Sequence, residues 1–479
     1  MAVDAAAKNL SKVEHIVVLM LENRSFDHML GYLSLKGGRT DIDGLKPGMS
    51  NDAGGKTYFI EHLHATHIPN PDWDPDHSSA ATDKQIGGGR MDGFAASFAE
   101  TLAARHVTDP APDPGMVMGY YDASDVPVYD HLADQFCVCD RWHSSVAGAT
   151  WPNRLYAVAG SAAGSRDDKA PPSIYAKHSF VRHLDAADVN WRWYTYDIGT
   201  LRFVDHEYLL GHREHFAYVQ KSKLPWRVLL EEELFLDEDS ASFLEDAQRG
   251  RLAPVSWIDP NFIELNLAHA QSNDDHPPSD IGAGQELVML VYNALAAGPL
   301  WEKTLLVVVY DEHGGFHDHV PPPEASDDDP VMFGSYGVRV PALAVSPWIS
   351  QRAVSHSLFD HTSIIKTILT RFAPMELDQR SPVGTRVHWL EEGHPHYMGK
   401  RVAAAEHLGS LLTESTPRSA PARQKLVEWL ATRHSQHAER LVADPVAFPA
   451  EERLFTDLQR SMLTAAQHVR GEGLPPHQP

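Results

Sequence analysis

Two short apolar runs stand out along the chain, because each of them ends abruptly in acidic or amide residues. The first run, His15–Leu21, precedes Glu22–Asn23, and the second, Thr304–Tyr310, precedes Asp311–Glu312. Continuous runs of this length that are rich in β-branched residues fit strands buried on both faces, as in a parallel sheet covered by helices. Ligands bind beyond the carboxyl ends of the strands in such sheets, so the pattern also indicates where a functional site would lie.

Further elements along the chain alternate between strands and helices. The apolar segments Pro254–Ile258 and Val338–Val345 predict two more strands, whereas Ile281–Ala297 and Thr362–Phe372 have helical spacing. Strands that alternate with helices indicate an α/β sandwich with a central, largely parallel sheet and helices on both faces. The segment Asn51–Gly89 is rich in Gly, Pro, Asp and His, and it predicts a long loop over this sheet.

The character of the chain changes near residue 401. From there on, Ala, Leu, Glu and Arg recur with helical spacing, as in Ala422–His437 and Glu451–Arg470. We therefore expect a main domain over residues 1–400 and a helical C-terminal extension over residues 401–479 that packs on it.

The charge of the chain argues against some partners. Its 479 residues include 41 Lys and Arg against 65 Asp and Glu, which gives a formal net charge of −24. A sequence-independent grip on nucleic acid needs clustered Lys and Arg, and so does adhesion to an anionic membrane, so we expect neither. No apolar run is long enough to span a membrane and no signal peptide is visible, so we expect a cytoplasmic protein without a transmembrane segment.

The residues that follow the two apolar runs form a candidate metal site. Their carboxylate and amide oxygens are the donor set that suits a divalent cation, and they belong to Glu22, Asn23, Asp311 and Glu312. Acidic residues at a single strand end are often solvated or cap a helix, so either pair alone would be weak evidence. Two such pairs after two buried strands favour a metal site. Donors of this kind accept Ca²⁺, Mn²⁺, Zn²⁺ or Fe, so they do not define the metal.

A second candidate is Thr150, in the segment Thr150-Trp-Pro-Asn-Arg154. Pro152 favours the start of a helix, which places Thr150 at an N-terminus where free N–H groups and the helix dipole favour an anion such as phosphate. Taken alone, Thr150 would more simply cap this helix. Beside a divalent metal its hydroxyl pKa falls, and the alkoxide can attack phosphorus before water hydrolyses the phospho-enzyme.

Two of the 29 histidines lie in acidic surroundings that suit proton transfer. His77 follows Asp74-Pro-Asp, and His276 follows Asn273-Asp-Asp. A histidine can protonate a leaving alkoxide or hold a phosphoryl oxygen at neutral pH. With so many histidines in the chain, most of the others are expected to be surface or packing residues.

Several blocks of the chain occur together, in this order, in one known family. The blocks are Glu22–Gly31, Thr150–Arg154, Asp275–Pro278, Asp311–Val320 and Gly337–Pro341. They resemble the phosphoesterase family, which includes bacterial phosphatidylcholine-type phospholipases C, plant non-specific phospholipases C and an acid phosphatase branch. The resemblance is specific because several uncommon blocks coincide, and it extends over roughly residues 14–372. The chain differs from the secreted members in showing no signal peptide, and from the larger phospholipases in having a helical tail instead of a β-rich extension.

The resemblance implies an alkaline-phosphatase-like α/β fold, with residues 1–400 as the phosphoesterase catalytic domain. It implies that Thr150 is the nucleophile that bridges metal and phosphorus, and that His77 and His276 bind the phosphoryl group or shuttle protons. Asn153 would be a further phosphate-binding residue. The residues that would hold the metal are Glu22, Asn23, Asp311, Glu312 and Thr150.

Together, these observations predict a metal-dependent phosphoric ester hydrolase. The leading hypothesis is a phospholipase C that cleaves glycerophospholipids of the phosphatidylcholine type to diacylglycerol and a phosphorylated head group through a phosphothreonine intermediate. The alternative within the enzyme class is an acid-phosphatase-like phosphomonoesterase acting on a small phosphate ester. A third hypothesis is a non-catalytic metal- or phosphate-binding protein, which is disfavoured because every expected position carries a competent residue.

Overall fold

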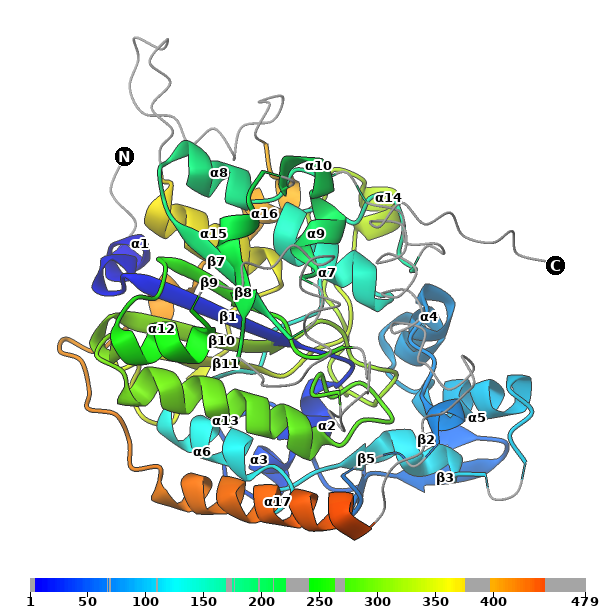
Figure 1. The fold of residues 1–479 in the computed structure, drawn as a ribbon. Helices are drawn as coiled ribbons and strands as arrows, with labels where there is room; N and C mark the ends of the chain where they lie inside the picture. Colours follow the sequence, from blue (N-terminus) through cyan, green and yellow to red (C-terminus); the bar gives the residue numbers. More distant parts are fainter. Residues whose placement is uncertain are drawn as a thin grey trace.

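An 8-stranded sheet with strand order β12-β6-β11-β10-β1-β9-β7-β8 forms the centre of the molecule (Figure 1). The structure is a computed structural model that describes residues 5–443 except 67, 69, 109–110, 169–174, 176, 197–198, 210, 221–240, 263–271 and 375–396. β11 runs antiparallel to both of its neighbours, and the other neighbouring strands are parallel. The predicted α/β class with a largely parallel central sheet is therefore confirmed.

The strands of this sheet are short and nearly all buried. In chain order they are β1 (His15–Leu21), β6 (Cys137–Cys139), β7 (Trp191–Thr195), β8 (Phe216–Tyr218), β9 (Val255–Ile258), β10 (Thr304–Tyr310), β11 (Ala342–Val345) and β12 (Ala353–Ser355). β1 and β10 coincide with the two predicted runs, and every residue of β10 is buried. Such burial follows from cover on both faces, which is what the uninterrupted apolar pattern predicts.

The predicted strand over Val338–Val345 is only half right. The strand begins at Ala342, and the chain before it turns to other partners: the Val340 N–H group donates to the Trp142 carbonyl oxygen at 3.0 Å, and Arg339 forms an isolated bridge with His143. Pro341 has no N–H group and cannot take part fully in a ladder of hydrogen bonds. The proline therefore marks the point at which the chain joins the sheet.

Helices cover both faces of the sheet. In Figure 1, one side carries α6 (Pro127–Gln135), α12 (Phe243–Arg249) and α13 (Ile281–Ala297), and the other carries α7 (Thr150–Ala159), α8 (Val181–Ala186) and α15 (Thr362–Phe372). α13 and α15 have the predicted bounds. The other described α-helices are α1 (Ala5–Asn9), α2 (Phe26–Leu30), α3 (Tyr32–Leu35), α4 (Ser79–Ile86), α5 (Phe94–Ala104), α9 (Leu201–Val204), α10 (His206–Leu209), α14 (Pro330–Phe333), α16 (Lys400–Ala404) and α17 (Gln424–Ala443).

The predicted loop over Asn51–Gly89 contains regular structure, so that prediction is wrong. β2 (Ser50–Ala53) and β3 (Lys56–Phe59) form an antiparallel hairpin, β4 (Glu61–His62) pairs with β5 (Gly119–Tyr120), and α4 follows. Gly54 and Gly55, at the turn of the hairpin, have φ values of 58° and 80°. Glycine adopts this region at no steric cost, so the residues that suggested a loop here form a tight turn between two strands.

The C-terminal part of the described chain packs against the rest. α17 agrees with the helix predicted over Ala422–His437, and in Figure 1 it runs alongside α6 and α13, where Arg433 pairs with Glu286 at 2.7 Å. Val402 and Leu408 are buried in the main core, so the predicted boundary at residue 400 falls within a packed segment. The helix predicted over Glu451–Arg470 lies outside the described residues, and the division into two domains stays a prediction.

A buried hydrogen-bond chain fixes the segment before α13 to the end of β10. The Tyr310 hydroxyl donates to Asp275 Oδ2 at 2.5 Å, and the Tyr129 hydroxyl lies 2.6 Å from the Tyr310 hydroxyl. Asp275 has a φ of 73°, a conformation that non-glycine residues rarely adopt, so its surroundings must hold it in place. Burial raises the pKa of Asp275 to about 7, although the hydrogen bond from Tyr310 acts in the opposite direction.

Shortening a buried side chain of β10 is expected to destabilise the whole sheet. Leu306 is 0% exposed, so Leu306→Ala removes buried methyl groups and leaves a cavity, which should lower the free energy of unfolding by about 2–5 kcal/mol. Leu358 is 37% exposed and serves as the matched control, for which we expect a change within about 0.5 kcal/mol. Urea unfolding followed by circular dichroism measures both, and equal effects would show that β10 is not part of a packed core.

The Asp275 carboxyl group is expected to make stability depend on pH. Because its folded pKa of about 7 lies above the ordinary value of 3.8, the folded state binds a proton that the unfolded state releases. Its contribution is present at low pH and is lost, by about 1.4 kcal/mol per pH unit, as pH rises from about 4 to 7. Asp275→Asn removes the titration, so the difference in stability between variant and wild type should vary over this range. A difference that stays constant between these pH values would contradict the shifted pKa.

Candidate active site

Four of the five predicted metal ligands lie together at one edge of the sheet. β1 and β10 are paired in parallel from His15 opposite Thr304 to Leu21 opposite Tyr310, so the residues that follow both strands emerge side by side. The Asn23 N–H group donates to Asp311 Oδ1 at 3.3 Å. The side chains at this edge are completely buried, and they belong to Glu22, Asn23, Asp311 and Glu312.

Four oxygen atoms of the predicted metal ligands are buried without a hydrogen-bond partner among the residues that the structure describes. They are Glu22 Oε2, Asn23 Oδ1, Glu312 Oε1 and Thr150 Oγ1. Leaving a buried polar group unsatisfied costs about 1–3 kcal/mol, and more where the group is charged, so several such groups at one place need an explanation. All four are hard oxygen donors, and the set therefore fits a divalent cation.

Arg154 joins the two strand ends and was assigned no role from the sequence. Its Nε atom lies 3.0 Å from Glu22 Oε1 and 3.1 Å from Asp311 Oδ2. Its guanidinium group also approaches Asp259 at 3.8 Å. Arg154 is one helical turn from Thr150, on the same side of α7, and this spacing is the sequence signal that could have revealed it.

Burial dominates the electrostatics of these carboxylates. It raises the pKa of Glu22 well above its ordinary value and raises that of Asp311 to about 7, while the charge of Arg154 lowers both. One buried guanidinium therefore does not offset the acidic groups around it. A cation in this place would stabilise the ionised carboxylates, which the protein alone holds at a cost.

Thr150 is the first residue of α7, and its side chain does not cap the helix. The N-cap position is Ala149, which makes no side-chain capping bond, and the buried Thr150 hydroxyl is among the four unsatisfied oxygens described above. Pro152 is the third residue of the helix, where its missing N–H group leaves no intrahelical bond unmade. The hydroxyl is thus held at the N-terminus of the helix whose Arg154, one turn further on, contacts both acidic strand ends.

Asn153 holds the loop that leads into α7. Its side-chain oxygen accepts from the Val146 N–H group at 2.9 Å, and its side-chain nitrogen donates to the carbonyl oxygens of Val146, Gly148 and Ala149. These contacts use the whole amide group to position the backbone before Thr150. Its binding of phosphate stays a prediction.

His77 and His276 lie close together, with their ring centroids 5.7 Å apart. The His276 Nδ1 atom is 2.7 Å from the Pro277 carbonyl oxygen and donates to it, while Nε2 is buried with no hydrogen-bond partner in the described part of the chain. Burial lowers the pKa of His276, so its ring is neutral near pH 7. Its Nε2 atom therefore carries a lone pair that can accept a proton.

The pKa values of the two histidines shift in opposite directions. His77 is partly buried, which acts against its charge, but the nearby Glu312 and Asp74 carboxylates raise its pKa to about 10. Nδ1 of His77 donates to the Pro75 carbonyl oxygen at 3.0 Å, and Nε2 lies 3.4 Å from Asn23 Nδ2. Two titratable groups whose environments push their pKa values apart are a common arrangement for an acid and a base.

Two tighter clusters of acidic and histidine side chains occur elsewhere in the described residues. Their members are Asp27, Asp318 and His319 in one, and His62, Asp122 and Asp125 in the other. In the first cluster, Arg339 already supplies a counter-charge, at 2.9 Å from Asp318 and 3.1 Å from Asp27. Acidic clusters that could hold a divalent cation are therefore present at more than one place. The predicted ligands differ from these two clusters because Arg154 separates Glu22 from Asp311 and several of their oxygens lack partners.

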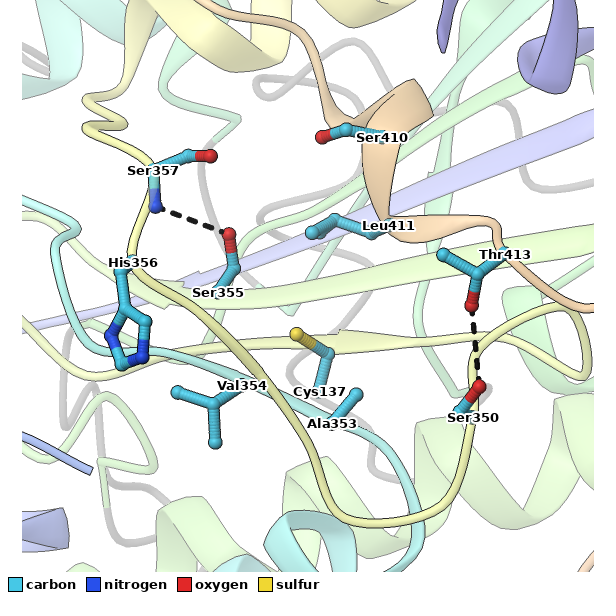
Figure 2. Close-up of a pocket in the computed structure, with 10 residues that line it drawn as sticks. All are labelled: Cys137, Ser350, Ala353, Val354, Ser355, His356, Ser357, Ser410, Leu411 and Thr413. Carbon is cyan, nitrogen blue, oxygen red and sulfur yellow. Dashed lines mark hydrogen bonds between the residues drawn. The ribbon is translucent and has the colours of Figure 1, made fainter. Parts of the chain in front are cut away.

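A pocket of about 430 Å³ lies along the edge strand β12, apart from the predicted residues (Figure 2). Its lining includes Cys137 and the hydroxyl groups of Ser350, Ser355 and Thr413. Ser350 and Thr413 are hydrogen-bonded to each other across it at 3.2 Å. None of the candidate metal, nucleophile or histidine residues lines this pocket.

Comparisons with known proteins identify related phospholipases. The chain is 32% identical over 385 residues to non-specific phospholipase C6 of Arabidopsis thaliana, which covers 76% of this chain and 68% of that protein. It is 30% identical over 406 residues to phospholipase C A of Mycobacterium tuberculosis, with 76% of this chain and 74% of that protein covered.

Among the described residues, no helix has both the length and the apolar character to cross a bilayer.

Solved structures show more distant similarity. The PsFucS1 sulfatase from Pseudoalteromonas sp. aligns with a TM-score of 0.37 at 12% identity, over 87% of this chain and 76% of that chain. A protein in the alkaline phosphatase superfamily from Vibrio parahaemolyticus aligns with a TM-score of 0.29 at 10% identity, over 71% of this chain and 74% of that chain. At these TM-scores the similarity carries no functional information.

The family assignment rests on the sequence matches. The phosphoesterase family model covers residues 13–374, the part of the chain that contains both acidic strand ends, Thr150 and the two histidines. The protein is accordingly a hydrolase that acts on phosphoester bonds. This chain belongs to the phosphoesterase family.

Proposed function

We propose that the protein is a metal-dependent phospholipase C that cleaves phosphatidylcholine-type glycerophospholipids to diacylglycerol and a phosphorylated head group. One observation carries the proposal: the buried Thr150 hydroxyl has no partner among the described residues, and it lies one helical turn before Arg154, which contacts Glu22 and Asp311 at the ends of β1 and β10. The names of the related proteins support a phospholipid as the substrate.

The residues proposed to hold the metal are Glu22, Asn23, Asp311 and Glu312, together with Thr150. Arg154 occupies one oxygen of Glu22 and one of Asp311, which leaves Glu22 Oε2 and the other unpartnered oxygens available. A bound divalent cation supplies Lewis acidity, which lowers the pKa of a hydroxyl group and stabilises charge on phosphoryl oxygens.

Thr150 acts as the nucleophile in this proposal. Its Oγ atom attacks phosphorus, forms an Oγ–P bond and displaces the diacylglycerol oxygen, which leaves the head-group phosphate on the threonine. Water then attacks phosphorus, breaks the Oγ–P bond and releases the phosphorylated head group. The N–H groups and the dipole at the start of α7 favour the negative charge of the phosphoryl oxygens throughout.

His77 and His276 divide the work of binding and proton transfer. The protonated His77 ring pairs with phosphoryl oxygens and can give a proton to the leaving diacylglycerol oxygen. The neutral His276 ring accepts the Thr150 proton at Nε2 in the first step and returns it to the departing Thr150 oxygen in the second. His77, left neutral by the first step, then accepts a proton from the attacking water. This division follows the opposite pKa shifts of the two rings.

Removing the Thr150 hydroxyl is expected to abolish turnover while leaving the fold intact. For Thr150→Ala we expect kcat with phosphatidylcholine to fall by on the order of a thousandfold or more, because no other group can form the covalent intermediate. Thr150→Ser keeps a hydroxyl group and should retain a measurable part of the activity. Wild-type turnover by Thr150→Ala, with either phosphatidylcholine or p-nitrophenyl phosphate, would show that another residue is the nucleophile.

Chelation is expected to remove activity, and a single metal should restore it. The buried carboxylates need a cation, so a chelated sample should also melt at a lower temperature and recover both activity and melting temperature on add-back of one of Ca²⁺, Mn²⁺, Zn²⁺ or Fe²⁺. Glu312→Gln should weaken this recovery. Asp122→Asn, which changes the acidic cluster of His62, Asp122 and Asp125, should not. Full activity of a sample shown by elemental analysis to contain no metal would rule out the metal-dependent mechanism.

A further inference from the structure

A carboxylate already lies at the N-terminus of the helix that carries Thr150. The N–H group of Trp151, the residue after Thr150, donates to Asp168 Oδ1 at 2.8 Å. Backbone N–H groups in the first turn of a helix are the donors that bind phosphate in many proteins. Asp168 therefore places a negative charge in the same first turn that would face the phosphoryl group of a substrate.

The loop that carries Asp168 is fixed on two sides. The Arg166 carbonyl oxygen accepts from the Ala149 N–H group at 3.0 Å, which ties the loop to the start of α7. The Asp167 carboxylate accepts from both the N–H and the hydroxyl group of Ser79, each at 2.6 Å, which ties it to the start of α4. The loop thus bridges the helix of Thr150 and the segment of His77, and it holds Asp168 between them.

The charge of Asp168 lies where the phosphoryl group is proposed to bind. Its Oδ1 atom is 2.8 Å from the Trp151 nitrogen, in the first turn of α7, next to the proposed nucleophile Thr150. Phosphodiesters carry one negative charge, whereas phosphomonoesters carry close to two above about pH 6, the region of their second pKa. A fixed carboxylate at this place therefore penalises the monoester more than the diester.

We propose that Asp168 determines specificity by making this site select singly charged phosphodiesters over doubly charged phosphomonoesters. The inference rests on the proposed function, because it concerns the substrate class of the same site. It also explains how a site with two histidines and a helix N-terminus, which would otherwise suit a phosphomonoester, is adapted to a phospholipid.

A purely structural role for Asp168 makes a different prediction. If Asp168 only caps α7, its acceptor atom matters and its charge does not. Asp168→Asn keeps a side-chain oxygen that can accept from the Trp151 N–H group and removes the charge. Asp167→Asn makes the same change of charge one residue away, on a side chain that contacts Ser79 rather than α7, and it is the matched control.

The test compares two esters with the same leaving group, bis(p-nitrophenyl) phosphate and p-nitrophenyl phosphate, using the metal-loaded protein at about pH 8. For Asp168→Asn we expect kcat/KM for the monoester to rise by on the order of tenfold and that for the diester by only about threefold, because the repulsion scales with the charge of the ester. Asp167→Asn should change neither. The inference is overturned if Asp168→Asn changes both esters by the same factor or changes neither.

A binding measurement separates this inference from the proposed function. If the wild-type protein hydrolyses neither ester, the proposed function fails, but calorimetric titration of each variant with inorganic phosphate and with dimethyl phosphate still decides the role of Asp168. Tighter binding of inorganic phosphate by Asp168→Asn, with a clearly smaller gain for dimethyl phosphate, supports the inference. Equal affinities of wild type and variant for inorganic phosphate overturn it.

Discussion

The in-register pairing of β1 with β10 is the contact on which the site depends. Because Leu21 lies opposite Tyr310, both strands end at the same level and deliver their acidic and amide side chains to one place. A shift of one residue in either strand would turn its side chains to the other face of the sheet. The apolar side chains of both strands, buried by helices on each side, hold that register, so packing in the core sets the geometry of the site.

The carboxylates at this edge of the sheet carry more negative charge than the guanidinium group of Arg154 offsets. Glu22, Asp311 and Asp259 all lie near the single guanidinium group of Arg154, and Glu312 is buried beside them. The net charge of −24 thus has a local counterpart in the interior, where carboxylates are costly unless paired. A divalent cation bound here, as proposed, would reverse the local sign and make the site suitable for an anionic ester. The composition therefore does not conflict with a phosphorylated substrate, although it still argues against nucleic acid.

Local patterns in the sequence predict those helices and strands whose bounds are set by the residues within them. The bounds of β1, β10 and α13 follow from hydrophobic runs and periodicity, and the convergence of the two strand ends follows from parallel pairing. The direction of β11 does not follow, because a run of apolar residues reads the same in either direction. The composition of the segment did not predict the β2–β3 hairpin, because glycines are equally typical of a tight turn and of a long loop.

Contacts between distant segments account for what the sequence could not predict at the site. Arg154 pairs with Glu22 across 132 positions of the chain, and Tyr310 with Asp275 across 35, and no periodicity encodes such pairs. Asp168 lies in an irregular segment that carries no pattern of its own, and only the fold brings it to Trp151. The residue types at the site were thus predictable, whereas the groups that position and tune them were not.

In the proposed mechanism, Thr150 becomes covalently attached to the head-group phosphate. Acid quenching during turnover of phosphatidylcholine, followed by peptide mass spectrometry, tests it most directly. The mechanism predicts a peptide in which Thr150 carries one phosphorylated head group and which appears during turnover. In the Thr150→Ser variant, the serine at this position should carry the modification instead. Steady turnover of the lipid with no modified peptide in any quenched sample, or a modification on another residue, would contradict the mechanism.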